Sequence, residues 1–513
     1  MKSTEKAYRI IQKPFLILIL LPLYVISKDA AVLTDELSVS FLALIAFATV
    51  VVQLNISGLL RLFGFRTWKN AITAGSAILI PILFFGPLHD LLKASSIPGV
   101  LTSYRVTVPV LTGAIILFLF TIRKHSLQRL STYLNATLII LTFLEFVIIL
   151  DTFRRPASSR LLDSEMKAMQ EFQRHKLPDT LPDIFFLVFD SYSSSYSLKK
   201  TLQFDNTAAD QHLKENGFRI FNEACSNFNH TLLSISSIFN MSYPQLPEDA
   251  AQDISQFYYK ANRSLQTNAL FNILKANGYD VKTTQHLSMQ RSKSSLPGYF
   301  DVMIVHHYVY RTLPGRLYRD LGYLLKQNDF FSAFFIQKQD SQCKRLYDYT
   351  QQSIAAIQNT CSTESDGPPQ FMYAHFMIPH EPWCFDSHGS IRPGKEVYRD
   401  SNFVTGYLQQ VQYTNQIIKQ LVLQIQNNNR PNTLIIIAGD HGYRSHNDVD
   451  MREHIFRIRF AAYHPQPLIE DWPESISGVN IFRLVLNTFL GAQMELLPHE
   501  AFYLQKKTNS ERN

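Results

Sequence analysis

The feature that most constrains this chain is a series of long apolar segments confined to its first third. A helix needs about 20 mostly apolar residues to cross the hydrocarbon core of a bilayer. Five segments reach or approach this length: Pro14–Ile26, Val39–Leu60, Ala71–Leu92, Val106–Ile122 and Tyr133–Leu150. The first is short, but no small-residue cleavage site follows it, which favours a retained helix over a signal peptide. We therefore predict a bundle of five transmembrane helices over residues 1–152.

Basic residues mark alternate loops between these segments. They lie in the N-terminal tail, the second loop and the fourth loop: Lys2, Lys6, Arg9, Lys13, Arg61, Arg66, Lys69, Arg123, Lys124 and Arg129. By the positive-inside rule the N-terminus is cytoplasmic, and five crossings place everything after about Asp151 outside. Glu145 is an acid inside the fifth segment, and either a functional role or a position at headgroup level accounts for it.

Charge and cysteine content narrow the partners and the redox setting. The chain has 49 basic and 42 acidic residues, a net charge of +7, without a basic stripe, which argues against a nucleic-acid partner. Its four cysteines form no CxxC pair and permit one or two disulfides, although buried thiols are an equal alternative. Of the four, Cys225, Cys343, Cys361 and Cys384, we favour pairing Cys343 with Cys361 because they flank one helical stretch.

After an amphipathic linker helix predicted over residues 153–182, the pattern of the chain changes to that of an α/β domain over residues 183–513. Short apolar runs predict buried strands at Ile184–Phe189, Val302–Val305, Phe371–Phe376, Leu434–Ala438 and Phe456–Tyr463. Helical patterns lie between them at Asn206–Asn216, Leu265–Asn277, Arg316–Lys338, Lys344–Thr360 and Phe403–Asn427. This alternation predicts a mainly parallel sheet covered on both faces, with ligands at the carboxyl ends of its strands.

Potential metal ligands follow two of the predicted strands. Asp190 ends the first strand, where an aspartate is also a common helix cap. Asp440 and His441 end the strand in TLIIIAGDHG, and Gly442 allows the backbone to turn there. Carboxylate and neutral imidazole side chains together suit zinc or manganese.

A hydroxyl-rich helix start lies between these strands, in SNFNHTLLSISSIFNM. Asn229 or Thr231 is expected to cap a helix that runs to Asn240. A hydroxyl at a helix N-terminus is favoured as a nucleophile because the helix dipole attracts the anion that it attacks. For an isolated threonine, an ordinary helix cap is the better explanation.

Four histidines are candidates for binding a substrate. His375 and His380 flank a strand end in AHFMIPHEPWCFD, and His380 is expected to face outward from a Pro-His-Glu-Pro turn. A histidine there can donate to a phosphate oxygen or to a leaving group. His446 and His454 follow the Asp-His pair and can approach the same site.

These motifs, in this order, resemble the sulfatase-like branch of the alkaline phosphatase superfamily, and most of all its membrane enzymes such as lipoteichoic acid synthases and lipid A phosphoethanolamine transferases. The resemblance implies an alkaline-phosphatase-like α/β/α domain behind five transmembrane helices, in a bacterial inner membrane with the domain outside the cytoplasm. SGVNIFRLVLNTFLG resembles the closing helix of that family.

Carried across, the resemblance implies that Asp190, Thr231, Asp440 and His441 bind a divalent metal, with Thr231 also the nucleophile and His380 on the substrate side. Zinc or manganese is expected, with magnesium or calcium as alternatives. The chain departs from its relatives in three ways. It has no C/S-x-P-x-R motif for formylglycine, which authentic sulfatases need. Ligands for only one metal are clear, whereas alkaline phosphatases proper use more, and Ser-Tyr-Ser follows Asp190 where a turn containing glycine is expected.

The resemblance implies transfer of a phospholipid headgroup, phosphoethanolamine or phosphoglycerol, through a phosphothreonine to an envelope glycan or lipid. Two alternatives stay open from the sequence. One is a hydrolase of phosphate or sulfate esters on the same fold, and the other is a non-catalytic membrane protein that binds envelope glycans.

Overall fold

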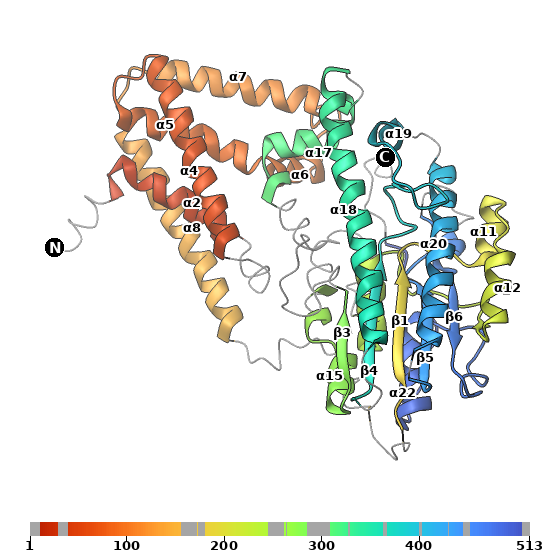
Figure 1. The fold of residues 1–513 in the computed structure, drawn as a ribbon. Helices are drawn as coiled ribbons and strands as arrows, with labels where there is room; N and C mark the ends of the chain where they lie inside the picture. The colour runs from red at the N-terminus through yellow and green to blue at the C-terminus, as the bar shows by residue number, and fades with distance from the viewer. Residues whose placement is uncertain are drawn as a thin grey trace. The chain divides into compact units, whose positions relative to one another are not determined.

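The computed structural model of this chain describes residues 11–28, 39–154, 172, 180–244, 261–262, 264–284, 308–326, 329–362, 367–399, 403–428, 430–444 and 452–504 (Figure 1). The chain divides into two compact units, Met1–Ala157 with Asp301–Gln327, and Ser158–Phe300 with Asn328–Asn513. The predicted linker helix falls almost entirely outside the described residues, and the predicted strand Val302–Val305 falls wholly outside them.

The first unit is helical. Its elements are η1 (Pro14–Leu16), α2 (Ile17–Ser27), α4 (Val39–Leu62), α5 (Trp68–Leu83), α6 (Phe85–Ala94), α7 (Tyr104–Ile122), α8 (Gln128–Arg154) and α17 (Leu313–Lys326). Among the described residues, three helices are long and apolar enough to cross a membrane, namely Phe41–Leu62, Tyr104–Ile122 and Gln128–Asp151. A fourth span is possible if α5 and α6, which are bent by 51°, count as one. The protein is therefore a membrane protein.

Fewer than the five predicted spans meet the length and composition needed to cross a membrane among the described residues. The first predicted span is the shorter apolar helix Pro14–Ser27, and the third is broken at Phe84. Pro87 explains the break, since its ring clashes with the carbonyl one turn earlier and it has no amide hydrogen to donate.

Two polar contacts organise this unit. Glu145 accepts a hydrogen bond from Lys28 Nζ at 2.9 Å, so the acid of the last span is paired with a base that follows α2. Helix α17 comes from the middle of the sequence but packs on α6, where the Gly86 amide donates to Arg311 O at 2.7 Å. By sequence, α17 belongs to the predicted 183–513 domain; in the structure it completes the helical unit.

The second unit is built on a six-stranded sheet of order β2-β6-β5-β1-β4-β3. Its strands are β1 (Asp183–Phe189), β2 (Arg219–Ile220), β3 (Asp280–Thr283), β4 (Gln370–Phe376), β5 (Thr433–Gly439) and β6 (Phe460–Tyr463). The strands β3, β4, β1 and β5 run parallel to one another. At one edge, β6 pairs antiparallel with β5, and β2 pairs antiparallel with β6. The predicted α/β fold with a mainly parallel sheet is confirmed.

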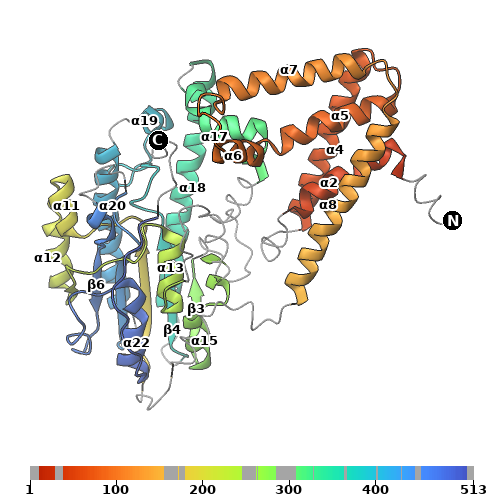
Figure 2. The same cartoon turned by 180° about the vertical axis from the view of Figure 1, so that it is seen from behind.

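Helices cover both faces of this sheet (Figures 1 and 2). One face carries α13 (Thr231–Asn240), α15 (Ala269–Ala276) and α22 (Ile481–Leu490). The other carries α11 (Ser195–Leu202), α12 (Thr207–Glu215), α18 (Asp329–Cys361) and α20 (Phe403–Gln426). Shorter elements are α19 (Gly394–Arg399), α21 (Arg452–Phe456) and η3 (Gly478–Asn480).

The central strand β1 supplies core to both layers because its side chains alternate between the two faces. Phe185, Leu187 and Phe189 pack with α18 and α20. Phe186 points the other way, and its ring makes edge contacts with Phe239 of α13 and Phe482 of α22. A strand that is buried on both faces produces the continuous apolar run in the sequence.

Two predicted elements differ in the structure. The apolar run Phe456–Tyr463 was expected to be one strand, but its first residue ends α21 and β6 starts at Phe460. The helices predicted at Arg316–Lys338 and Lys344–Thr360 are instead α17 and the long α18, which begins at Asp329.

The single disulfide among the described residues joins Cys343 to Cys384, and Cys225 and Cys361 are free thiols. The expected pairing of Cys343 with Cys361 is wrong because both lie in the continuous helix α18. Eighteen residues of helix separate them by about 27 Å at 1.5 Å per residue, far beyond the reach of a disulfide. Cys384 follows the Pro-His-Glu-Pro turn, so the bond ties that turn to α18.

Replacing Cys384 by alanine should lower the free energy of unfolding of the second unit by about 2–4 kcal/mol, because the bond closes a long loop in the unfolded chain. Thermal unfolding of the detergent-purified protein measures the change. Cys361→Ala, which breaks no disulfide, is the matched control and should lower the free energy of unfolding by less. Alkylation without reductant should modify two cysteines, and modification of all four would contradict the disulfide.

Candidate metal centre

The register of the sheet brings the candidate ligands to one face. Val188 of β1 pairs with His375 of β4 and with Ala438 of β5. Asp190 and Asp440 lie two residues beyond Val188 and Ala438, and side chains two apart in a strand share a face. This is the face covered by α13, which begins with Thr231.

Asp190 is buried where β1 ends, and the turn after it is strained. Its amide donates to Phe376 O at 2.9 Å, which extends the β1–β4 pairing by one step. Ser191 then has a φ of 67°, the left-handed conformation that glycine adopts most easily. The glycine expected after Asp190 is thus replaced by a serine in a glycine-like conformation, at a cost on the order of 1 kcal/mol. The turn directs the Ser191 amide to Asp440 Oδ1 at 2.8 Å.

Asp440 is fully buried and uses one carboxylate oxygen for backbone amides. Its Oδ1 accepts from Ser191 N and from His441 N, at 2.8 and 2.9 Å. Within the described ranges, its Oδ2 has no hydrogen-bond partner, and neither does Oδ1 of Asp190. Buried carboxylate oxygens are rarely left so, and each needs a compensating group. Gly439 is required here, since a Cβ would come within 2.4 Å of Tyr192 O.

The tautomer of His441 follows from its surroundings. Its Nδ1 lies 2.8 Å from Gly442 O, which can only accept, so Nδ1 carries the hydrogen. The Nε2 lone pair then faces Asp190 Oδ1 and Asp440 Oδ2, each at 3.6 Å. Burial, followed by the charge of Arg444, holds the pKa of His441 well below its usual value, so the ring stays neutral at pH 7.

Thr231 completes this group. Its Oγ1 is 3.4 Å from His441 Nε2 and 3.5 Å from Asp190 Oδ2. It is the first residue of α13, whose N-cap is His230 without a side-chain hydrogen bond. Asn229, expected as a possible cap, instead exchanges two hydrogen bonds with the backbone of Leu504.

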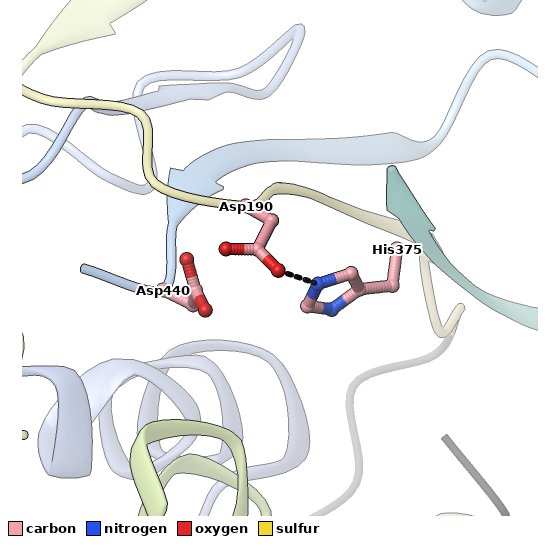
Figure 3. Close-up of side chains that lie close together, drawn as sticks. All are labelled: Asp190, His375 and Asp440. Carbon is pink, nitrogen blue, oxygen red and sulfur yellow. Dashed lines mark ion pairs between the residues drawn. The ribbon is translucent and has the colours of Figure 1, made fainter. Parts of the chain in front are cut away.

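His375 lies beneath the group and away from solvent. Its Nε2 is 3.7 Å from Asp190 Oδ2 (Figure 3). Its Nδ1 is 2.7 Å from Tyr373 Oη. Asp190, His375 and Asp440 each offer a ligand atom, and these atoms lie within 4.8 Å of one another. His375 is fully buried, and the structure places it beside the two carboxylates.

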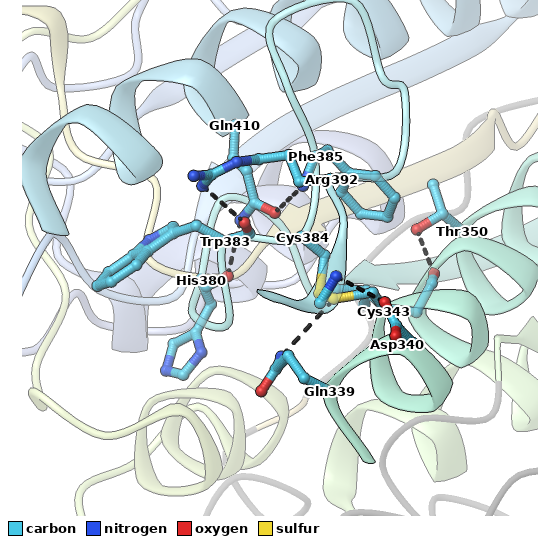
Figure 4. Close-up of a disulfide and its surroundings, with 12 residues drawn as sticks. Gln339, Asp340, Cys343, Thr350, His380, Trp383, Cys384, Phe385, Arg392 and Gln410 are labelled. Carbon is cyan, nitrogen blue, oxygen red and sulfur yellow. Dashed lines mark hydrogen bonds between the residues drawn. A yellow bond between two sulfur atoms is a disulfide. The ribbon is translucent and has the colours of Figure 1, made fainter. Parts of the chain in front are cut away.

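His380 sits at the rim, on a turn that is anchored from two sides. Gln410 of α20 donates to the carbonyls of Pro379 and His380, at 3.2 and 2.9 Å. The Cys343–Cys384 disulfide holds the end of the turn (Figure 4). The ring of His380 is half-buried, and its centroid is 6.3 Å from that of His441.

The two later histidines differ in outcome. His446 lies outside the described residues. The backbone of His454 passes Gly442, but its ring contacts Ser197 Oγ at 3.1 Å and lies near the ring of Tyr196, so the structure directs it to α11.

Arg444 is a site residue that the sequence analysis missed. Its guanidinium contacts Asn229 O at 3.1 Å and His380 Nε2 at 2.5 Å. The available signal was its position, three residues after His441 and on the same turn.

The group can hold a divalent cation. His441 Nε2 lies 3.6 Å from both Asp190 Oδ1 and Asp440 Oδ2, and Thr231 Oγ1 lies 3.4 Å from His441 Nε2 and 3.5 Å from Asp190 Oδ2. Burial and the nearby charge of Asp190 raise the pKa of Asp440 to about 6. A bound cation would offset the repulsion between the two carboxylates and would give their unpaired oxygens a partner. The residues present fit such an ion.

A sheet of this topology with this group at its carboxyl edge defines an enzyme of the alkaline phosphatase superfamily. The sulfatase family model matches residues 182–493, which make up most of the chain. The chain belongs to the sulfatase family. No match is found among curated proteins.

Several solved structures are similar to this chain. Lipooligosaccharide phosphoethanolamine transferase A from Neisseria meningitidis has 14% identity and a TM-score of 0.36, over 92% of this chain and 95% of that one. The zinc complex of the C-terminal periplasmic domain of EptC from Escherichia coli has 10% identity and a TM-score of 0.37, over 65% and 95%. An alkaline phosphatase superfamily protein from Vibrio parahaemolyticus has 11% identity and a TM-score of 0.37, over 66% and 76%. These values are too low to carry an activity to this chain.

Asp440→Asn should abolish metal binding and at the same time stabilise the metal-free protein. The pKa of Asp440 is raised from 3.8 to about 6 in the folded state, so the metal-free protein loses stability as pH rises from about 4 to about 6. Asparagine keeps the Oδ1 acceptor and removes the charge, so the metal-free variant should be more stable than the wild type above pH 7. Thermal unfolding in chelator and in zinc, from pH 4 to 8, measures both effects.

The exposed Asp471, changed to asparagine, is the control and should behave as wild type in both conditions. A wild-type zinc-induced increase in Tm for Asp440→Asn would show that Asp440 is not a ligand.

Proposed function

We infer that this protein transfers a phospho-headgroup from a membrane phospholipid through a covalent phosphothreonine at Thr231. The observation that carries the proposal is the position of Thr231 Oγ1, 3.4 Å from His441 Nε2 and 3.5 Å from Asp190 Oδ2. A threonine that served only as a helix cap would bond the backbone of its own helix. This one faces a group of metal-ligating atoms.

Zinc is the metal that best suits the residues, with Asp190, Thr231, Asp440 and His441 as its ligands. Ligand atoms about 2.05 Å from a tetrahedral ion lie about 3.4 Å apart, close to the separations in this group, whereas octahedral magnesium or manganese brings neighbouring ligands to about 3.0 Å. Calcium prefers oxygen ligands alone, which disfavours it beside His441. When bound, the ion lowers the pKa of the threonine hydroxyl and offsets negative charge on the phosphoryl oxygens.

The reaction has two balanced steps. Thr231 Oγ1 forms a bond to phosphorus while the bond from phosphorus to the diacylglycerol oxygen breaks, and the hydroxyl proton ends on that oxygen. An acceptor hydroxyl then displaces Thr231 from phosphorus and returns a proton to it. Thr231 sits at the N-terminus of α13, where unpaired amides and the helix dipole favour the negative phosphoryl group.

The architecture of the chain supports a lipid donor. The same polypeptide carries several apolar helices, which would anchor the catalytic unit to the membrane where headgroups are available. The alternating basic loops favour a catalytic domain outside the cytoplasm, and a disulfide is typical of an oxidising compartment. We propose a bacterial inner membrane, a phosphoethanolamine or phosphoglycerol donor, and an envelope glycan or lipid as acceptor, with residues 183–513 supplying the catalytic residues.

Incubation of the zinc-loaded, detergent-purified protein with phosphatidylethanolamine and phosphatidylglycerol should produce a mass adduct on Thr231, because the intermediate persists without an acceptor. Intact mass spectrometry detects the adduct, and its mass identifies the headgroup. Thr231→Ala should carry no adduct and lose turnover. Thr231→Ser should still form the adduct and turn over, but more slowly than the wild type.

Thr207 is a matched control, since it is an exposed threonine that also begins a helix, and Thr207→Ala should behave as wild type. Turnover retained in Thr231→Ala would refute the nucleophile. An adduct released to water as fast as to any acceptor would instead identify a hydrolase, which the same geometry permits.

A further inference from the structure

Arg444 lies close to the candidate metal centre, where its charge acts on His441. It follows Gly442 by two residues and is half-buried. Nη1 donates to Asn229 O at 3.1 Å and approaches His230 Nδ1 at 3.4 Å, and Nη2 donates to His380 Nε2 at 2.5 Å. The guanidinium therefore spans from the segment just before Thr231 to the turn that carries His380.

These contacts fix the tautomer of His380. A guanidinium has donors and no acceptor, so His380 Nε2 must present its lone pair to Arg444. His380 Nδ1 lies 2.6 Å from Glu381 O, a carbonyl that can only accept, so Nδ1 carries the hydrogen. In this arrangement His380 has both ring nitrogens engaged. It has no N–H to give to a phosphate oxygen or to a leaving group.

Arg444 does have donors to give. Three of its five N–H groups are taken by Asn229 O, His230 Nδ1 and His380 Nε2. The Nε–H and one Nη2–H, which share an edge of the planar group, have no partner within the ranges that the structure describes. Two parallel N–H groups on one edge match two oxygens of a phosphoryl group.

Both anchors of the guanidinium are themselves held. Asn229 exchanges hydrogen bonds with the Leu504 backbone, at 3.0 and 2.9 Å. The carbonyl of His380 accepts from Gln410 at 2.9 Å, and the disulfide closes the turn at Cys384. A donor fixed by rigid neighbours loses little freedom when an anion arrives, which is the condition for strong electrostatic stabilisation.

We propose that Arg444 binds the non-bridging oxygens of the transferred phosphoryl group, and that His380 is a positioning residue that orients Arg444 rather than a proton donor. The proposal rests on the proposed function, since it takes Thr231 as the group attacked onto phosphorus. The chemistry recognised is a phosphate oxyanion, whether it belongs to a lipid headgroup or to free phosphate.

The test uses the full-length, zinc-loaded protein in detergent and two phosphate sources. Calorimetry measures the affinity for inorganic phosphate, and steady-state kinetics measures kcat and KM with phosphatidylethanolamine in mixed micelles. Arg444→Gln should weaken phosphate binding and lower kcat/KM by about 10²–10³-fold, as for the loss of an oxyanion donor, with unchanged zinc content. Arg444→Lys keeps the positive charge but not the two parallel N–H donors, so its phosphate affinity and kcat/KM should lie between those of the wild type and of Arg444→Gln. Arg219→Gln, on the edge strand β2, is the control and should leave both measurements unchanged.

His380 gives the sharper comparison. Glutamine can accept from Arg444 but cannot donate a proton from a ring nitrogen, so His380→Gln should retain phosphate affinity and most of kcat. His380→Ala removes the acceptor and should weaken phosphate binding about tenfold. In the double variant His380→Ala/Arg444→Gln, the losses of phosphate affinity from the two single variants should not add, because both act through the Arg444 guanidinium. Guanidinium ion added to Arg444→Ala should restore part of the turnover.

Wild-type phosphate affinity in Arg444→Gln would overturn the role of Arg444. Loss of kcat in His380→Gln equal to that in His380→Ala, with phosphate affinity intact, would make His380 the proton donor instead. Failure of the proposed function is separate from both outcomes, since it appears as turnover or an adduct in Thr231→Ala whatever the Arg444 variants show.

Discussion

The parallel pairing of β1 with β4 and β5 is the constraint on which the rest of this structure depends. Because side chains alternate along a strand, this register puts Asp190, His375 and Asp440 on one face, under the start of α13. A slip of one residue in either pairing would turn a ligand into the opposite layer, among the aromatic and aliphatic side chains of α20. Core packing on both faces of β1 is therefore what fixes the metal centre.

The same register concentrates negative charge in a buried place. Two buried carboxylates face the lone pair of a neutral imidazole, which is unfavourable in the folded metal-free chain. Backbone amides offset part of this cost at Asp440 Oδ1, and the left-handed Ser191 is the local strain that delivers one of them. The arrangement is unfavourable without a cation and favourable with one, so stability and metal binding are coupled.

The rim of the site has a different origin. His380 and Arg444 come from two loops, and their mutual orientation depends on Gln410, on Asn229 and on a disulfide to α18. Gln410, Asn229 and the α18 half of the disulfide are all distant in sequence from His380 and Arg444. The sequence motif identified His380 as a polar residue at the site, but which of its nitrogens bears the hydrogen is decided by neighbours that only the fold supplies.

The sequence by itself determined the apolar helices, the α/β pattern and the order of the motifs around Asp190, Thr231, Asp440 and His441, because hydrophobic periodicity and short motifs are local properties. It did not determine the break at Phe84, the packing of α17 on the helical unit or the partner of Cys343. Those depend on which distant segments meet. Only the tertiary structure decided that the candidate ligands converge and that Arg444 joins them, since convergence is a matter of strand register and loop anchoring rather than of local sequence.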